Sequence, residues 1–222
     1  MTRYFNTEGA CNPKEHYMVR LDERIAKIKR LFVDRKKYFV INRGRQYGKT
    51  TTLKALAKEL AKDYLVFALD FQKFETGNFE NAVKFSKAFV KKLSIAIGDV
   101  ETENEKELKK LLLDFQNDTS DTVMDALFVC LSNLCEKSSC SIVLIIDEVD
   151  SASNNQVFID FLAQLRGYYL EREVTPIFHS VILAGVYDIK NLKLKLRPDA
   201  EHQYNIPRTI ILMLCIWTQL QF

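Results

Sequence analysis

The segment Arg43-Gly-Arg-Gln-Tyr-Gly-Lys-Thr50 lies between an apolar run, Tyr38-Phe-Val-Ile-Asn42, and a stretch with helical periodicity. A glycine loop that follows a strand and opens a helix presents backbone N–H groups at a helix N-terminus, where phosphate anions bind favourably. The segment ends in Gly-Lys-Thr, as in the phosphate-loop pattern G-x-x-x-x-G-K-[ST], although Arg43 stands in place of the first glycine and Gly44 follows one residue later. The sequence therefore predicts a nucleoside triphosphate site on this loop.

The loop and the first helical turn are expected to share the contacts with the nucleotide. We expect their backbone amides to surround the triphosphate, Lys49 to reach the β- and γ-phosphates, and the Thr50 hydroxyl to ligate Mg²⁺. The predicted cofactors are therefore ATP and Mg²⁺. The residues predicted to contact the nucleotide are Arg43, Gly44, Arg45, Gln46, Tyr47, Gly48, Lys49, Thr50 and Thr51.

A second polar motif, Asp147-Glu148-Val149-Asp150, follows the apolar run 142–146. Four or more apolar residues followed by Asp-Glu form the Walker B pattern. A buried strand in a parallel sheet delivers such carboxylates to the edge of the sheet where ligands bind. We expect Asp147 to hold Mg²⁺, directly or through water, and Glu148 to polarise the attacking water. With Lys49, Glu148 is a predicted catalytic residue of an ATP hydrolase.

Apolar runs and helical stripes alternate along the rest of the chain. The runs predict strands at 38–42, 65–70, 141–146 and 177–184, and the stripes predict helices over 21–32, 53–60, 82–93, 123–134 and 157–165. Strands that are apolar without alternation are buried on both faces, and helices between them make right-handed crossovers. The predicted fold is α/β, a three-layer sandwich with a mainly parallel sheet. The charged stretch 101–110 is interpreted as a solvated helix start or loop.

Composition excludes several classes of protein. The chain of 222 residues is 47% hydrophobic and 27% charged, which is typical of one globular domain. Its net charge of +3 is far below the clustered positive charge of a dedicated nucleic-acid binder. The first residues lack the apolar core of a signal peptide, and no run approaches the roughly 18 apolar residues that span a bilayer. We therefore expect a cytoplasmic protein without a membrane role.

The five cysteines are interpreted as reduced thiols. Their number is odd, and most lie in apolar surroundings, where a free thiol behaves as a small hydrophobic side chain. Cys130, Cys135 and Cys140 are five residues apart, which rotates successive side chains off one helical face. This spacing argues against a metal site.

The loop and the Walker B strand, with two further strands, resemble bacterial AAA-like ATPase families related to the STAND and archaeal-type ATPases. Several of those families also carry an arginine at the first loop position, followed by Arg-x-aromatic-Gly-Lys-Ser/Thr, which Arg43, Arg45 and Tyr47 fit. The resemblance covers about residues 10–205. It implies an ASCE sheet with strand order five-one-four-three-two, in which the fourth strand separates the Walker B strand from the loop strand. The runs that carry it are 38–53, 65–71, 142–150 and 181–188.

The resemblance leaves some positions unassigned. The fourth strand leads into Tyr187 and Asp188, without the Asn, Thr or Ser often found at the sensor position, so no sensor residue is assigned. An arginine finger cannot be chosen among Arg166, Arg172 and Arg197, each of which is also consistent with a surface arginine.

The chain is divided into an AAA-like P-loop ATPase domain, residues 1–205, and an atypical apolar tail, residues 206–222. The tail contains the apolar run 210–217, which is compatible with a fifth strand. Its composition also fits a truncated or frame-shifted gene, and we slightly favour that interpretation.

Three functions are compatible with these motifs. The leading hypothesis is an ATPase whose hydrolysis drives a conformational switch or motor, with a protein partner or a homo-oligomer. A nucleotide-dependent interaction module without significant hydrolysis is the main alternative, but it has no need of a base such as Glu148. The third is a nucleic-acid-associated ATPase of a mobile element or defence system, supported by a basic cluster that is more often a solvated helix face. The cluster comprises Lys27, Lys29, Arg30, Arg35, Lys36 and Lys37.

Overall fold

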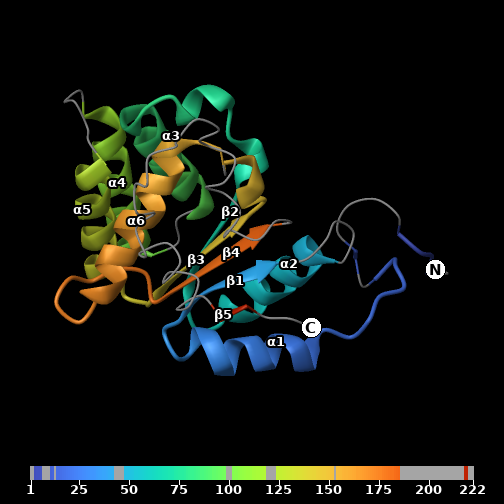
Figure 1. Ribbon diagram of the computed structural model, residues 1–222. Helices are drawn as coiled ribbons and strands as arrows, with labels where there is room; N and C mark the ends of the chain where they lie inside the picture. Colours follow the sequence, from blue (N-terminus) through green and yellow to red (C-terminus); the bar gives the residue numbers. More distant parts are fainter. Residues whose placement is uncertain are drawn as a thin grey trace.

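A parallel β-sheet forms the centre of the protein (Figure 1). The computed structural model describes residues 3–6, 11–12, 14–42, 48–98, 102–118, 124–152 and 154–185, and the backbone of 218–219. The strands are β1 (Tyr38–Asn42), β2 (Leu65–Asp70), β3 (Ile142–Asp147), β4 (Ser180–Gly185) and β5 (Thr218–Gln219). Every strand pair among them is parallel.

The strand order β5-β1-β4-β3-β2 confirms the predicted topology. β4 separates β3 from β1, as the resemblance implied, and Asn42 at the end of β1 is the register partner of Gly185 at the end of β4. The fifth position is taken by Thr218 and Gln219, which pair with Phe39 and Val40 of β1. Residues 206–217 lie outside the described residues, so both interpretations of the tail stay predictions.

Helices cover both faces of the sheet (Figure 1). β1, β3 and β4 are buried almost throughout, as predicted, whereas β2 is only partly buried and exposes Ala68. One layer holds α1 (Asp22–Ile28) and α2 (Lys49–Leu60), and the other holds α3 (Ala82–Ala96), α4 (Glu103–Asn117), α5 (Met124–Lys137) and α6 (Gln156–Leu170). Within the described ranges, no helix is long and apolar enough to cross a membrane.

The side chains of β3 show how the sheet supplies two cores. Ile142, Leu144 and Ile146 belong to the core shared with α3, α4, α5 and α6, whereas Val143 and Ile145 belong to the core shared with α1 and α2. All five are buried. Because successive side chains of a strand point to opposite faces, Asp147 continues the second series and faces α2.

The first predicted helix changes its geometry midway. α1 continues into a π-helical segment, Lys29–Val33, in which the N–H of Asp34 donates to the carbonyl of Lys29 (2.9 Å). Phe32 and Val33, in this segment, are both buried.

The charged stretch after α3 begins a full helix. The Thr102 hydroxyl accepts a hydrogen bond from the Glu105 N–H (3.2 Å), and the Glu105 carboxylate accepts one from the Thr102 N–H (3.0 Å). This capping box satisfies N–H groups that otherwise lack partners at the start of α4. Leu108 and Leu112 are buried, so the solvated helix start becomes an amphipathic helix.

The described cysteines are free thiols. Burial raises the pKa of Cys130 to about 12 and raises the pKa of Cys135 further. Because reaction and metal binding require the thiolate, both groups act as apolar packing residues at neutral pH.

Candidate active site

The candidate site lies at the carboxyl edge of the sheet, where β1 leads into the phosphate-loop segment and β3 ends at Asp147. α2 begins there at Lys49, directly after Gly48. Gly48 has φ 71° and ψ 24°, in the left-handed region. Among the described residues, no atom lies within 4 Å of a Cβ built on Gly48, and its positive φ is the conformation that favours glycine.

A hydrogen bond joins the two predicted motifs. The Thr50 hydroxyl at the start of α2 donates to Asp147 Oδ2 at the end of β3 (2.9 Å). The other carboxylate oxygen, Oδ1, accepts from the Glu148 N–H (2.9 Å). These contacts orient the carboxylate and place it beside a hydroxyl, and such hard oxygen donors suit Mg²⁺.

Lys49 is buried without a counter-charge among the described residues. Only 7% of its surface is exposed, and within the described part of the chain its Nζ has no hydrogen-bond partner. A buried ammonium that lacks a partner is costly, because desolvation is not compensated. An anionic ligand would remove this cost, and the ammonium sits at the helix N-terminus where phosphate binds best.

Glu148 has a strained backbone. Its φ of 54° and ψ of 42° are left-handed, and of the described non-glycine residues only Lys36 shares a positive φ. Ser151 holds this conformation, because its hydroxyl (2.8 Å) and its N–H (3.1 Å) both donate to the Glu148 carbonyl. Such strain costs about 1–3 kcal/mol and is concentrated at functional sites. It falls here on the predicted catalytic base.

A family model described as an AAA-like domain matches residues 27–192, which include both motifs. The chain belongs to this family of AAA-like domains. No curated protein matches the sequence.

Two solved structures share the fold of this AAA-like domain. One is a Walker-type ATPase of Pyrococcus abyssi, with 16% identity and a TM-score of 0.51 over 81% of this chain and 48% of the other. The second is the ORC1 protein of Aeropyrum pernix in complex with DNA, with 10% identity and a TM-score of 0.51 over 82% of this chain and 44% of the other. The chain thus spans less than half of either structure, and at these identities the likeness shows the fold alone.

Sequence reasoning missed a close contact beside Glu148. A Cβ on Gly185 would lie 3.0 Å from both carboxylate oxygens of Asp150 and from Val149 Cγ2. Gly185 therefore lets the turn after Glu148 pack against the end of β4. A glycine at the end of an apolar strand indicates that another part of the chain packs closely there. Only the tertiary structure shows that this part is the turn with Val149 and Asp150.

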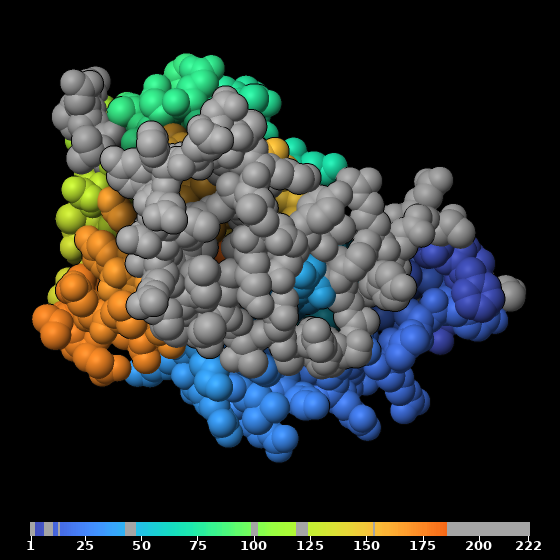
Figure 2. All heavy atoms as spheres, in the orientation of Figure 1, coloured from blue at the N-terminus to red at the C-terminus, as the bar shows by residue number. Residues whose placement is uncertain are grey.

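The N-terminal segment also reaches the AAA-like site. The Cys11 N–H donates to the Thr51 hydroxyl (3.1 Å), so residues before α1 lie against the start of α2. An isolated bridge between Tyr4 and His16 and an edge-on contact of their rings (4.8 Å) order this segment. In Figure 2 this segment is the darkest blue and lies at the right of the view, next to the blue residues along the lower edge. No sequence pattern had linked Cys11 to the loop.

Several candidate residues are not placed at this edge. Arg172, one of the possible arginine fingers, follows α6 and lines a cavity with residues that precede β3 and β4, at the opposite edge of the sheet. Arg166 lies on α6. Outside the described residues lie Arg43, Gly44, Arg45, Gln46, Tyr47, Tyr187, Asp188 and Arg197.

Proposed function

We propose that this AAA-like domain binds Mg-ATP at the carboxyl edge of the sheet and hydrolyses it. Two observations carry the proposal: the hydrogen bond from Thr50 to Asp147, and the buried ammonium of Lys49, next to Thr50 in the chain, which has no partner among the described residues. A hydroxyl, a carboxylate and a lysine that converge on a helix N-terminus suit a magnesium-bound triphosphate.

Lys49 and the start of α2 supply the positive potential for the phosphates. Lys49 would bind the β- and γ-phosphate oxygens through charge-assisted hydrogen bonds, which are stronger than neutral ones. The N–H groups of the first turn, including those of Thr50 and Thr51, add the partial positive charge of the helix N-terminus. The segment 43–47 is proposed to complete the loop around the triphosphate.

Thr50 and Asp147 are the proposed magnesium ligands. Mg²⁺ is usually held by one or two carboxylates together with phosphates and water, rather than by a complete protein cage. This agrees with the described residues, among which no cluster of three or more His, Cys, Asp or Glu side chains could hold a metal. Bound Mg²⁺ would neutralise charge on the phosphate oxygens, while Asp147 fixes its position relative to Lys49.

Glu148 is the proposed base. Its carboxylate would orient the attacking water and accept its proton, a role worth roughly 10²–10⁴ in rate. The hydrogen bond from its N–H to Asp147 ties its backbone directly to the metal ligand. A module that only binds nucleotide would not need a strained acidic residue at this point, which favours hydrolysis over the binding-only alternative.

We propose that hydrolysis acts as a conformational switch or motor on a protein partner or a second copy of the chain in the cytoplasm. Asp147 ends β3 and contacts Thr50 of α2, and the turn after it packs on Gly185 of β4. A change at the bound phosphates would therefore be transmitted to β3 through Asp147 and to β4 through Gly185. The nucleic-acid alternative loses part of its support, because Lys29 of the basic cluster is bound to Asp34 (2.9 Å) and Asp63 (3.2 Å).

Nucleotide-dependent stabilisation tests the proposal. Mg-ATP should raise the unfolding temperature of the wild-type chain by mass action, and Lys49→Ala should remove this shift. Lys54→Ala is the matched control, because Lys54 lies on the same helix and is exposed. Equal shifts for wild type and Lys49→Ala would refute this site, and ATP-dependent phosphate release then measures turnover.

A further inference from the structure

A cavity of about 230 Å³ lies at the amino edge of the sheet, opposite the candidate active site. Its lining comes from the beginnings of three strands. Lys36 precedes β1, Ile142 begins β3 and His179 precedes β4, while Arg172 and Glu173 come from the turn after α6. The proposed ATPase chemistry uses none of these residues.

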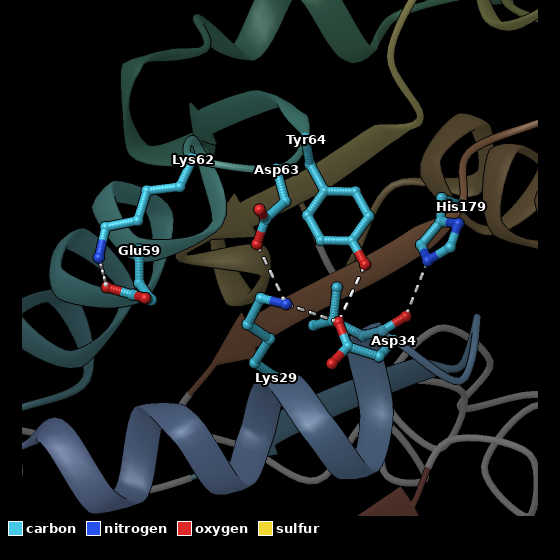
Figure 3. A network of polar contacts seen from close by, with 8 residues as sticks. Lys29, Asp34, Glu59, Lys62, Asp63, Tyr64 and His179 are labelled. Atoms are coloured by element: carbon cyan, nitrogen blue, oxygen red, sulfur yellow. Dashed lines mark hydrogen bonds and ion pairs between the residues drawn. The ribbon is translucent and has the colours of Figure 1, made fainter.

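The charges on this cavity are unbalanced. Lys36 and Arg172 are positive and Glu173 is negative. The Glu173 side chain is 80% exposed and stays well solvated, whereas that of Arg172 is only 29% exposed. The nearby acid Asp34 accepts contacts from Lys29 and Tyr64 (both 2.9 Å), so it is already engaged (Figure 3). The cavity therefore presents more positive than negative charge.

Arg172 is held rigidly with an unused donor. Its Nη1 donates to the Tyr169 carbonyl (2.7 Å), and its guanidinium lies 4.0 Å from the centre of the Tyr169 ring. Its Nε is buried and, within the described ranges, has no hydrogen-bond partner; it forms only a long ion pair with Glu173 Oε1 at 4.0 Å. A fixed guanidinium with a free N–H is well suited to bind an oxyanion.

Lys36 is the second left-handed non-glycine residue of the described chain, with φ 54°. It lies in the turn between the π-helical segment and β1, where its N–H donates to the Val33 carbonyl (2.9 Å). A glycine would adopt this conformation without strain. A lysine therefore lines the cavity at a position where glycine would be less strained.

His179, which is drawn in Figure 3, lines the same cavity as Lys36. Its Nε2 lies 3.0 Å from the Val33 carbonyl, which can only accept, so this nitrogen carries the proton. Its ring lies against Tyr64, with centroids 5.0 Å apart. Apolar surface from Ile142 and Ile177 adjoins these polar groups.

We propose that this cavity is a second ligand site, which binds the oxyanion group of a small molecule between Arg172 and Lys36. The group is a phosphate or a carboxylate, and the rest of the molecule packs against Ile142 and Ile177. A cavity of this size accepts a small metabolite rather than a macromolecule.

The test uses a chain with Lys49→Ala, because the phosphate loop is itself a candidate anion site. Inorganic phosphate and succinate are titrated separately, against sodium chloride at equal ionic strength, while the unfolding temperature and the ¹⁵N-labelled arginine Nε–H resonances are recorded. We expect saturable stabilisation by at least one anion and a shift of the Arg172 Nε–H resonance. The two titrations distinguish a phosphate from a carboxylate ligand.

Two substitutions added to Lys49→Ala separate binding from folding. Arg172→Gln should weaken anion binding at least about tenfold, which is the scale of one charge-assisted hydrogen bond. Lys36→Gly should weaken it similarly while raising the unfolding temperature without anion, because the strain is removed. Arg30→Gln, which removes an exposed arginine outside the cavity, should leave binding unchanged. Absence of saturable binding by the Lys49→Ala chain would overturn the proposal, and so would binding by the Arg172→Gln and Lys36→Gly chains that is as tight as in that parent chain.

Discussion

Both edges of the sheet carry lysine and aspartate side chains, but the lysines at the two edges differ in their partners. At the amino edge, Lys29 contacts both Asp34 and Asp63, and Tyr64 donates to Asp34 (Figure 3). The hydrogen bond to Asp34 raises the pKa of Lys29, which favours the charged pair. At the carboxyl edge, Lys49 is more deeply buried but has no partner among the described residues. Complete pairing stabilises the fold, whereas incomplete pairing leaves a place for a ligand.

Each edge also contains one strained non-glycine residue. Glu148 lies at the carboxyl edge and Lys36 at the amino edge, and both have φ 54°. Within the described chain, the edge that holds Glu148 also holds Lys49 Nζ, and the cavity lined by Lys36 is also lined by Arg172; neither Lys49 Nζ nor Arg172 Nε has a hydrogen-bond partner there. Strain and unsatisfied polar groups together mark a ligand site more specifically than charge does.

The largest expected effect is on turnover. Glu148→Gln should lower the rate of ATP hydrolysis by about 10²–10⁴ and retain the stabilisation by Mg-ATP, because it removes the base and not a phosphate contact. Phosphate release and thermal unfolding measure the two quantities. Glu171→Gln removes an exposed carboxylate from the turn after α6 and should change neither. Unchanged hydrolysis by Glu148→Gln would assign the base to another residue.

Replacing one aspartate at each edge by asparagine separates the effect on ATP binding from the effect on folding stability. Asp147→Asn should weaken magnesium-dependent ATP binding about tenfold or more, because a neutral amide is a poor ligand for Mg²⁺. Asp34→Asn should leave that binding intact and lower the free energy of unfolding by up to about 1 kcal/mol, the range for partly exposed ion pairs. Titration with ATP, with and without Mg²⁺, and urea unfolding provide the values. The comparison of the edges fails if both variants lose ATP affinity equally.

The packing of β4 against the turn after Glu148 gives a further prediction. Gly185→Ala should lower the free energy of unfolding by about 1–3 kcal/mol, because its Cβ would crowd Asp150 and Val149. Turnover should fall with it, since the same turn holds Glu148. Gly167→Ala on α6 meets no atom within 4 Å and should stabilise the protein by up to about 1 kcal/mol. Equal effects of the two substitutions in urea unfolding would show that the turn is free to move.

The smallest expected effect is a pH dependence at the amino edge. Burial lowers the pKa of His179 below 6.5, against the opposing effect of its bond to the Val33 carbonyl. The unfolded state therefore binds the proton more readily, so the stabilising contribution is complete above pH 6.5 and is lost as the pH falls towards the folded-state pKa. His179→Gln should reduce this loss, as urea unfolding at pH 8 and pH 5.5 would show. An identical pH profile for wild type and variant would exclude His179 as its source.

Much of the fold could be predicted because its signals are local. The strand β3 and the loop before α2 can each be recognised from residues that are adjacent in the sequence. The topology follows because parallel strands are joined by helices. The stretch 101–110 is compatible with a helix start or a loop, and a local signal favours the helix start, since Thr102 and Glu105 have the spacing of a capping box. The π-helical turn had none, because it depends on how Phe32 and Val33 pack on the sheet.

The sequence by itself determined which residues could carry the chemistry, because Lys49, Thr50, Asp147 and Glu148 lie in short motifs with fixed spacing. Only the tertiary structure decided how they meet. The hydrogen bond of Thr50 to Asp147, the contact of Cys11 with Thr51 and the space that Gly185 leaves for Asp150 join segments that are distant in the chain. Such contacts depend on the register and twist of the sheet, which no single segment specifies. The same reason explains why Arg172 could not be placed until the beginnings of β3 and β4 were brought beside it.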